Sequence, residues 1–147
     1  MSPLLPVLIV LGALLLSAAG GWAVTRLVLH LASRSSDAGR AHPATGPDGA
    51  VLLRAPLQAS DGPEGAGARA VLRGGTWIGI LERLATTAAL LTGQVGMVAV
   101  VVAVKGLGRY PELRENPGAS ERFVIGSLAS LLWSAAVGLA GRWLLGR

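Results

Sequence analysis

Side chains that could do chemistry are few in this 147-residue sequence, and those that stand out lie beside or inside long apolar runs. Glu82 and Arg83 are adjacent, so they can join a belt of ion pairs at a membrane surface, or form a gate or a binding site for an anionic head group. Gln94 lies inside an apolar run, where its amide can hydrogen-bond to a neighbouring helix or line a polar path. The candidate functional or interfacial polar residues are Glu82, Arg83, Gln94, Lys105, Arg109 and Glu121.

The residue types also limit the chemistry that we expect. Cysteine is absent, which excludes thiolate metal ligands and cysteine catalysis. His30 and His42 have no cluster of acidic residues around them, and the Ser and Thr residues show no pairing with a His or Lys base. Basic residues outnumber acidic ones by 13 to 8, but they flank apolar runs, as topogenic charges do. We therefore expect no catalytic residue, cofactor, metal or nucleic acid partner.

Three apolar runs supply the elements that position these side chains. Leu4–Val24 and Leu84–Val104 are each 21 residues long without a charge, and Phe123–Gly141 is 19 residues long. A helix needs about 20 such residues to cross the hydrocarbon core, and a lone strand would leave its backbone groups unpaired there. With 52% hydrophobic residues and a mean hydropathy of +0.57, the sequence predicts an all-α integral membrane protein with three transmembrane helices.

The composition changes between the first and second runs. Residues 33–75 are rich in Gly, Ala, Pro, Ser, Asp and Arg without a sustained period, which is typical of a long disordered loop. A short amphipathic helix over Val51–Leu57 is an alternative for part of it. We therefore divide the chain into a transmembrane helix at 1–32, a flexible polar loop at 33–75 and a two-helix transmembrane hairpin unit at 76–147. Removal of the first run as a secretory signal is a further alternative, although no basic residue precedes the run.

The connection between the second and third runs carries signals of short structure. Tyr110–Glu115 can make a helical turn that opens at Pro111, and Asn116-Pro117-Gly118 should end it. Ser120 is placed to cap the third helix, with Glu121 favourable in its first turn.

Basic and aromatic residues indicate how the chain crosses the membrane. With the amino terminus outside, nine Lys and Arg residues fall on the cytoplasmic side and four, in the second loop, fall outside. We therefore expect a protein of the inner (plasma) membrane whose long loop and carboxyl tail lie on the cytoplasmic side. Trp22, Trp77 and Trp143 then share one interface and Tyr110 lies at the other, as three crossings require.

The same topology separates the charged residues into two layers. Glu82 and Arg83 lie near the inner interface, at a level similar to that of Arg142. Lys105 and Glu121 lie near the outer interface. We expect any function to depend on these two layers rather than on the charge-free centres of the runs.

Small residues recur at four-residue spacing within the runs. These stripes are Ala13, Ser17 and Gly21 in the first run, Ala85, Ala89 and Gly93 in the second, and Gly126, Ser130, Ser134 and Gly138 in the third. Four-residue spacing keeps them near one helix face, where small side chains let two backbones approach in lipid. The stripe of the third run is the best candidate for helix packing between copies of the chain.

Short signatures in the second half of the chain form an ordered pattern. They are Gly75-Thr-Trp-Ile-Gly-Ile-Leu-Glu-Arg83, Gly93-Gln94, Ala103-Val-Lys105, Arg109, Glu121-Arg122-Phe123 and Ile125-Gly126-Ser127-Leu128. In this order they resemble the carboxyl-terminal part of a family of uncharacterised bacterial multi-pass inner-membrane proteins. The family has no assigned activity, and its usual pattern has more membrane segments before this block. The resemblance implies a bacterial inner-membrane location.

Two functional hypotheses follow. The first is a non-enzymatic integral membrane protein, surrounded by the lipid bilayer, that packs as a homo-oligomer or as an accessory subunit of a larger membrane protein. The alternative is a small transporter or channel subunit that uses Gln94 and the interfacial charges. Because no ionisable side chain lies in the central part of any run, the first hypothesis is favoured.

Overall fold

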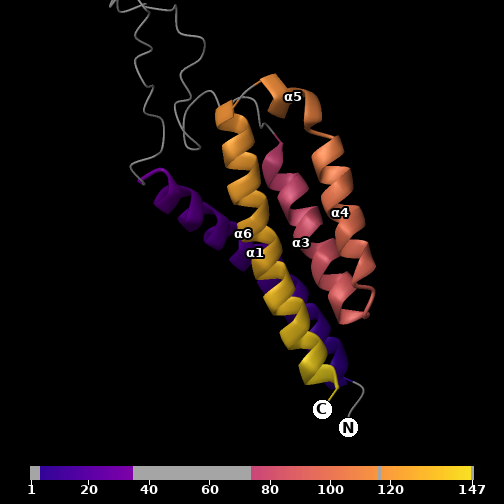
Figure 1. The fold of residues 1–147 in the computed structure, drawn as a ribbon. Helices are drawn as coiled ribbons and strands as arrows, with labels where there is room; N and C mark the ends of the chain where they lie inside the picture. The colour runs from indigo at the N-terminus through magenta and orange to yellow at the C-terminus, as the bar shows by residue number, and fades with distance from the viewer. Residues whose placement is uncertain (1–3, 35–73, 116, 147) are drawn as a thin grey trace, which may run out of the picture.

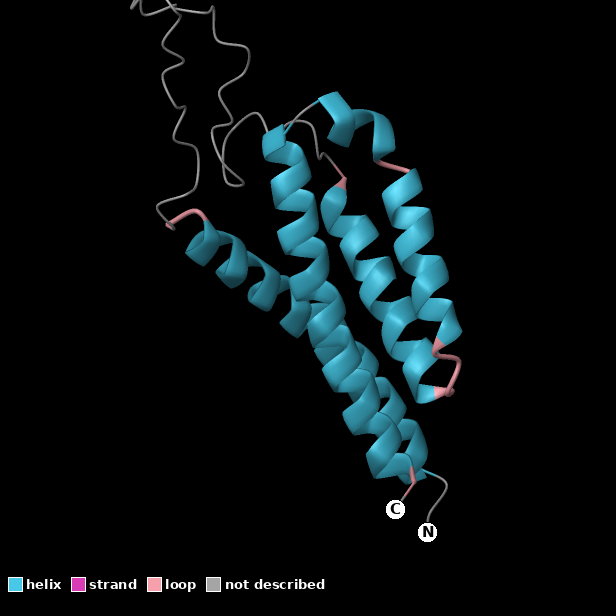
Figure 2. Cartoon of the chain, viewed as in Figure 1, coloured by secondary structure: helices cyan, strands magenta, loops and turns pink. Residues whose placement is uncertain are grey.

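The structure is a computed structural model that describes residues 4–34, 74–115 and 117–146, and these residues form helices and turns without a β-strand. Figures 1 and 2 show the arrangement of the helices. They are α1 (Leu4–Ala32), α3 (Gly75–Leu91), α4 (Gly96–Leu107), α5 (Tyr110–Glu115) and α6 (Pro117–Leu145). The predicted all-α fold class is confirmed for these residues. The predictions of a disordered loop and of an amphipathic helix at Val51–Leu57 fall mainly or entirely on 35–73, outside the described residues.

The first and third apolar runs form the two long helices. α1 and α6 have 29 residues each, about 43 Å of helix, and both are long and apolar enough to cross a membrane. α6 begins at Pro117, whose fixed φ and missing N–H suit the first helical position. Ser120 therefore lies inside the first turn, and its predicted role as the cap is wrong. α5 forms at the predicted turn over Tyr110–Glu115.

The second apolar run is not one helix, so the prediction of a single transmembrane helix over Leu84–Val104 is wrong. α3 ends at Leu91, α4 begins at Gly96, and residues 92–95 join them. The two arms have 17 and 12 residues, about 25 and 18 Å, and neither reaches the roughly 20 residues of an independent span. Figure 1 shows α4 returning beside α3 as the second arm of a helical hairpin.

The backbone around Gly93 builds this turn. Gly93 has a φ of +77°, in the left-handed region that glycine adopts at little cost. Its N–H donates to the carbonyl of Leu90 at 3.2 Å, and the N–H of Gln94 donates to the carbonyl of Ala89 at 2.7 Å. These two bonds form the Schellman motif that ends a helix. The length of the apolar run does not reveal this turn, because no residue of the turn is charged.

The hairpin returns the chain to the end of the molecule from which α3 starts. Figure 1 shows α5 and the start of α6 at that end, and the start of α1 with the end of α6 at the other. Trp77, at the start of α3, and Trp143, near the end of α6, therefore lie at opposite ends. The expected grouping of Trp22, Trp77 and Trp143 at one interface is wrong, because it assumed a continuous helix in the second run.

α1, α3 and α6 pack around small and hydroxylated side chains. Ser17, Thr87 and Ser134 are fully buried, and the Thr87 hydroxyl donates to Oγ of Ser17 at 2.6 Å. Small side chains allow this close approach. A Cβ added at Gly138 would lie only 2.9 Å from the Cβ of Leu90.

The stripe of the third run faces this core. Ser130 and Ser134 are buried, and Gly126 lies against the Thr25 and Leu29 side chains of α1. Contacts within the chain therefore cover the stripe, and it is not available for the expected contact between copies.

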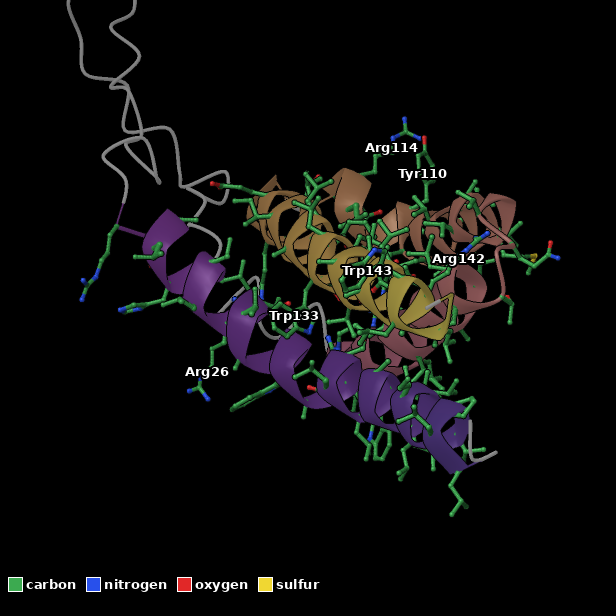
Figure 3. The ribbon with its side chains drawn as sticks, turned by 90° about the horizontal axis from the view of Figure 1, so that it is seen from below. Arg26, Tyr110, Arg114, Trp133, Arg142 and Trp143 are labelled. Carbon is green, nitrogen blue, oxygen red and sulfur yellow. The ribbon has the colours of Figure 1, made fainter. Side chains whose placement is uncertain are left out.

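Trp133 fills the space beside the glycines of α1. Its ring lies against Gly20 and Gly21, and its indole N–H donates to the carbonyl of Leu16 at 3.3 Å. Figure 3 shows Trp133 next to α1, whereas Trp143 lies further along α6. The aromatic side chain in the middle of the third run thus packs against a helix of the same chain.

Candidate functional site

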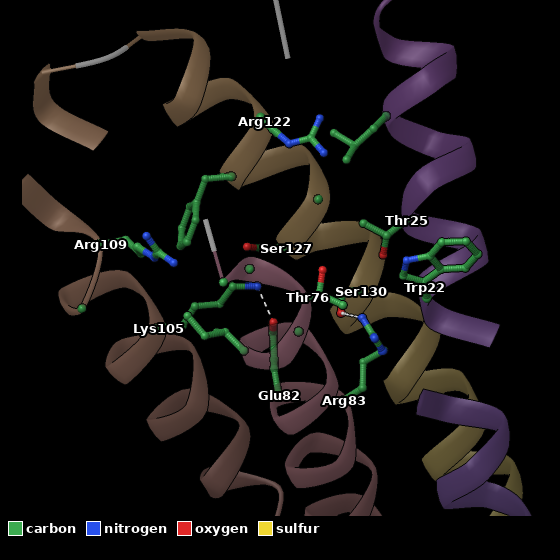
Figure 4. Close-up of a pocket in the computed structure, with 18 of the residues that line it drawn as sticks. Trp22, Thr25, Thr76, Glu82, Arg83, Lys105, Arg109, Arg122, Ser127 and Ser130 are labelled. Atoms are coloured by element: carbon green, nitrogen blue, oxygen red, sulfur yellow. Dashed lines mark hydrogen bonds and ion pairs between the residues drawn. The ribbon is translucent and has the colours of Figure 1, made fainter. Parts of the chain in front are cut away.

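A cavity of about 710 Å³ lies among α1, α3, α4 and α6, at the end of the molecule where the hairpin begins and ends. In Figure 4, α4 stands on the left and α1 on the right, with α3 and α6 between them. The charged residues that line the cavity are Arg26, Glu82, Arg83, Lys105, Arg109 and Arg122. The fold therefore gathers charges that are far apart in the sequence.

Glu82 and Lys105 form an ion pair within the cavity (Figure 4). The turn at Gly93 creates this contact, because it brings the last turn of α4 beside the middle of α3. The Glu82 side chain is 2% exposed and that of Lys105 is 15% exposed, so solvent and salt screen the attraction less than at a surface. Nζ of Lys105 also lies 5.4 Å from the centre of the Phe123 ring, within the range of a cation–π contact.

Arg83 lies where α1, α3 and α6 meet. The residue is 4% exposed, and its side chain occupies the space that a Cβ at Gly21 would need. Its Nη1 donates to Oγ of Ser130 at 3.5 Å, and its Nε has no hydrogen-bond partner among the described residues. A guanidinium has five N–H donors, so Arg83 retains donor capacity at the wall of the cavity.

Basic residues dominate the cavity. Five of its lining side chains are cationic and one, that of Glu82, is anionic. Arg109 and Arg122 border the cavity in Figure 4, whereas Arg26 projects from α1 away from the other helices in Figure 3, with its guanidinium 5.2 Å from the centre of the Trp22 ring. The start of α3 borders the same space, where the positive end of its helix dipole adds to the field. The arrangement therefore favours an anion.

Two hydroxyl groups of the cavity wall have no hydrogen-bond partner among the described residues. They are Oγ1 of Thr25 in α1 and Oγ of Ser127 in α6, and both atoms are buried. A buried polar group without a partner costs about 1–3 kcal/mol. Each of these residues therefore has an unused hydrogen-bond donor beside the cavity.

Apolar side chains also line the cavity. Trp22 and Leu29 come from α1, Ile78 from α3, Val104 from α4 and Phe123 from α6. Trp22 is half exposed, so the apolar wall continues onto the outer surface of α1. The cavity thus combines cationic and apolar surfaces.

The structure brings four of the six predicted polar residues to one site. Glu121 is an exposed residue of α6 outside the cavity, and Gln94 is exposed in the turn at the far end of the hairpin. Arg142, expected at the level of Glu82, lies beside Gly93 at that far end. The residues that meet are Glu82, Arg83, Lys105 and Arg109. The expected separation of these charges into two layers is wrong, because the chain turns back within the second run.

Sequence reasoning missed Thr25, Arg122 and Ser127 as members of a site. Thr25 carries a signal, since it continues the four-residue spacing of Ser17 and Gly21. Arg122 has only the signal of a charge that flanks a helix, and nothing in the sequence separates Ser127 from the other small residues of α6.

Known proteins give no information about the role of the cavity. No family model matches the chain, and neither a curated protein nor a solved structure matches it. The resemblance to a bacterial inner-membrane family therefore stays a prediction. Chemically, the arrangement can hold an anionic group by charge and by hydrogen bonds, with apolar contacts beside it.

Proposed function

We propose that the chain is a non-enzymatic integral membrane protein whose helices bind an anionic ligand in the cavity at one membrane surface. The charge of the cavity carries the proposal: Arg83, Lys105, Arg109 and Arg122 line it beside one carboxylate, which is already paired with Lys105. Arg side chains bind phosphate and carboxylate groups through paired N–H donors. A binding role suits the site better than a catalytic one, because Glu82 is the one carboxylate that lines the cavity and its Oε2 is held in an ion pair.

The outer surfaces of the long helices support the membrane assignment. Leu8 and Leu15 of α1 and Leu132 of α6 are each more than half exposed. Contiguous apolar surface of this kind is unfavourable in water and is covered by acyl chains in a bilayer.

The distribution of basic residues supports an orientation. Both ends of the hairpin lie at one end of α1 and α6, so the whole stretch between the long helices starts and ends on the same side of the membrane. Of the 13 Lys and Arg residues in the sequence, 11 occur from Arg26 to Arg122, and Arg142 and Arg147 follow later in the chain. By the positive-inside rule the cavity faces the cytoplasm, and the start of α1 and the end of α6 face outside. The bias is stronger than the nine to four expected for three crossings.

A protein partner or a second copy remains part of the proposal, at a different face from the one expected. α4 has no buried residue, and Met97, Val100 and Leu107 are exposed along it. Because α1 and α3 cover the stripe of α6, α4 is the better candidate for the contact of an accessory subunit.

A transporter or channel role has less support. Below Arg83, the interface of the three packed helices is closed by the hydrogen bond between Thr87 and Ser17 and by Leu90 against Gly138. Gln94 lies in the exposed turn and does not line the cavity. Conduction would require these helices to separate.

The test is whether anions stabilise the protein through the cavity. The panel consists of inorganic phosphate, glycerol 3-phosphate and phosphatidylglycerol, with phosphatidylcholine as the uncharged comparison, added to protein in a neutral detergent. We expect the melting temperature to rise with at least one anion, because a ligand at 100 times its Kd stabilises the folded state by about 2.7 kcal/mol. This increase in melting temperature should be smaller in a variant that combines Arg109→Gln with Arg122→Gln.

Arg114→Gln is the matched control for this experiment. Arg114 is an exposed residue of α5 at the same end of the molecule, but it does not line the cavity. The proposal is wrong if no anion raises the melting temperature, or if Arg114→Gln lowers the response as much as the cavity variants.

A further inference from the structure

We infer that the anion is the phosphate of an acidic membrane phospholipid, with its head group among the cations and an acyl chain against the apolar wall. This inference rests on the proposed function and narrows it to one ligand class. It depends on three properties of the cavity: its polar groups, its apolar wall and its position along the helices.

The polar groups suit a phosphodiester. Arg83 is 4% exposed and retains donor capacity, and Thr25 and Ser127 line the cavity from α1 and α6 with hydroxyls that have no partner among the described residues. Phosphate oxygens can accept bonds from several such donors at once, and arginine can bind two of them together. A zwitterionic head group would bring a further cation into a site that five cations already line.

The apolar wall suits a hydrocarbon chain. Trp22, Leu29 and Ile78 line the cavity. Trp22 and Ile78 are partly exposed, so this wall continues onto the outer surfaces of α1 and α3. A free phosphate ion would fill only a small part of about 710 Å³ and would leave this wall in contact with water. A lipid chain would cover it.

The position along the helices also suits a lipid head group. Lys105 follows the apolar part of α4, and Arg122 precedes the apolar run of α6. Basic residues at the ends of apolar runs lie at the level of the head groups, where acidic lipids concentrate on the cytoplasmic side.

The experiment measures lipid binding to the full chain in a neutral detergent by native mass spectrometry. Phosphatidylglycerol, phosphatidylcholine and glycerol 3-phosphate are titrated in parallel, so that the charge and the acyl chains are tested separately. We expect phosphatidylglycerol to bind at least about tenfold more tightly than either of the other two.

The two hydroxyls provide a variant that separates binding from folding. Thr25→Val combined with Ser127→Ala removes donors that bond to no described protein group, so the melting temperature without lipid should stay the same or rise. Binding of phosphatidylglycerol should weaken at least about tenfold, because hydrogen bonds to a charged group are lost. Thr86→Val is the matched control, since Thr86 is fully buried with an unpartnered hydroxyl but does not line the cavity.

Each outcome has a defined meaning. Tighter binding of phosphatidylglycerol, weakened by the double variant and unchanged by Thr86→Val, supports the inference. If phosphatidylcholine binds as tightly as phosphatidylglycerol, the site does not select an acidic lipid, and the inference is wrong. Equal binding of glycerol 3-phosphate overturns the lipid ligand and leaves the proposed anion site intact. If the double variant binds phosphatidylglycerol as tightly as the unchanged protein, the head group does not lie beside Thr25 and Ser127. If no anion changes the melting temperature, the proposed function itself is wrong.

Discussion

The pairing of Glu82 with Lys105 makes a buried carboxylate tolerable in α3. With 2% of its side chain exposed, Glu82 has lost most of its hydration, and only a charge partner at close range offsets that loss. The sequence identifies both residues as charges at the ends of apolar runs. It does not identify them as partners, because they are 23 positions apart and meet only through the turn at Gly93.

Removing one member of this pair should cost more than removing both. Lys105→Gln leaves the Glu82 carboxylate buried without its partner, which should lower the free energy of unfolding by about 3–5 kcal/mol. Glu82→Gln should cost less, because Lys105 is the more exposed member and can reach solvent. The double variant should recover part of the loss, measured by unfolding in mixed micelles of increasing denaturing detergent. Additive losses in the double variant would show that the two side chains act independently.

Among the elements, the long helices are the predictable part of the fold and the hairpin is the unpredictable part. α1 and α6 follow from runs of apolar residues, and α5 follows from Pro111 after a turn-rich stretch. The hairpin depends on the Schellman motif at Gly93, where one glycine φ angle decides between one helix and two. The signal in the sequence is the polar stretch Thr92-Gly93-Gln94 in the middle of an apolar run, and apolar length alone outweighs it.

Gly93→Ala and Gly96→Ala test the hairpin as a matched pair. Alanine at position 93 must adopt a φ of +77°, which should lower the free energy of unfolding by about 1–2 kcal/mol. Alanine at position 96 meets no atom within 4 Å in the first turn of α4, and it should be neutral or stabilise by up to about 1 kcal/mol through helix propensity. Both effects are read from unfolding in detergent. If Gly93→Ala and Gly96→Ala both raise the free energy of unfolding by the same amount, the second run continues as one helix through residue 93, and the hairpin is wrong.

At the scale of the whole molecule, the hairpin leaves two helices that are long and apolar enough to cross a membrane, where the sequence predicts three. With three crossings and the amino terminus outside, the second loop lies outside and the carboxyl end inside. With two crossings and the hairpin, these two sides are exchanged. The long loop is cytoplasmic in both cases. With three crossings, the sequence charges favour an external amino terminus only moderately, by nine to four. The return of the chain to the side of the loop joins Lys105, Arg109 and Arg122 to the basic majority and creates the cavity.

Cysteine accessibility in intact cells tests this arrangement most directly. The chain has no cysteine, so Gly146→Cys after α6 and Tyr110→Cys in α5 each report one exposed position. We expect a membrane-impermeant maleimide to label Gly146→Cys in intact cells and to label Tyr110→Cys only after the membrane is permeabilised. Labelling of Tyr110→Cys but not of Gly146→Cys in intact cells is the pattern of three crossings. That result would contradict the hairpin and, with it, a cationic cavity at the cytoplasmic surface.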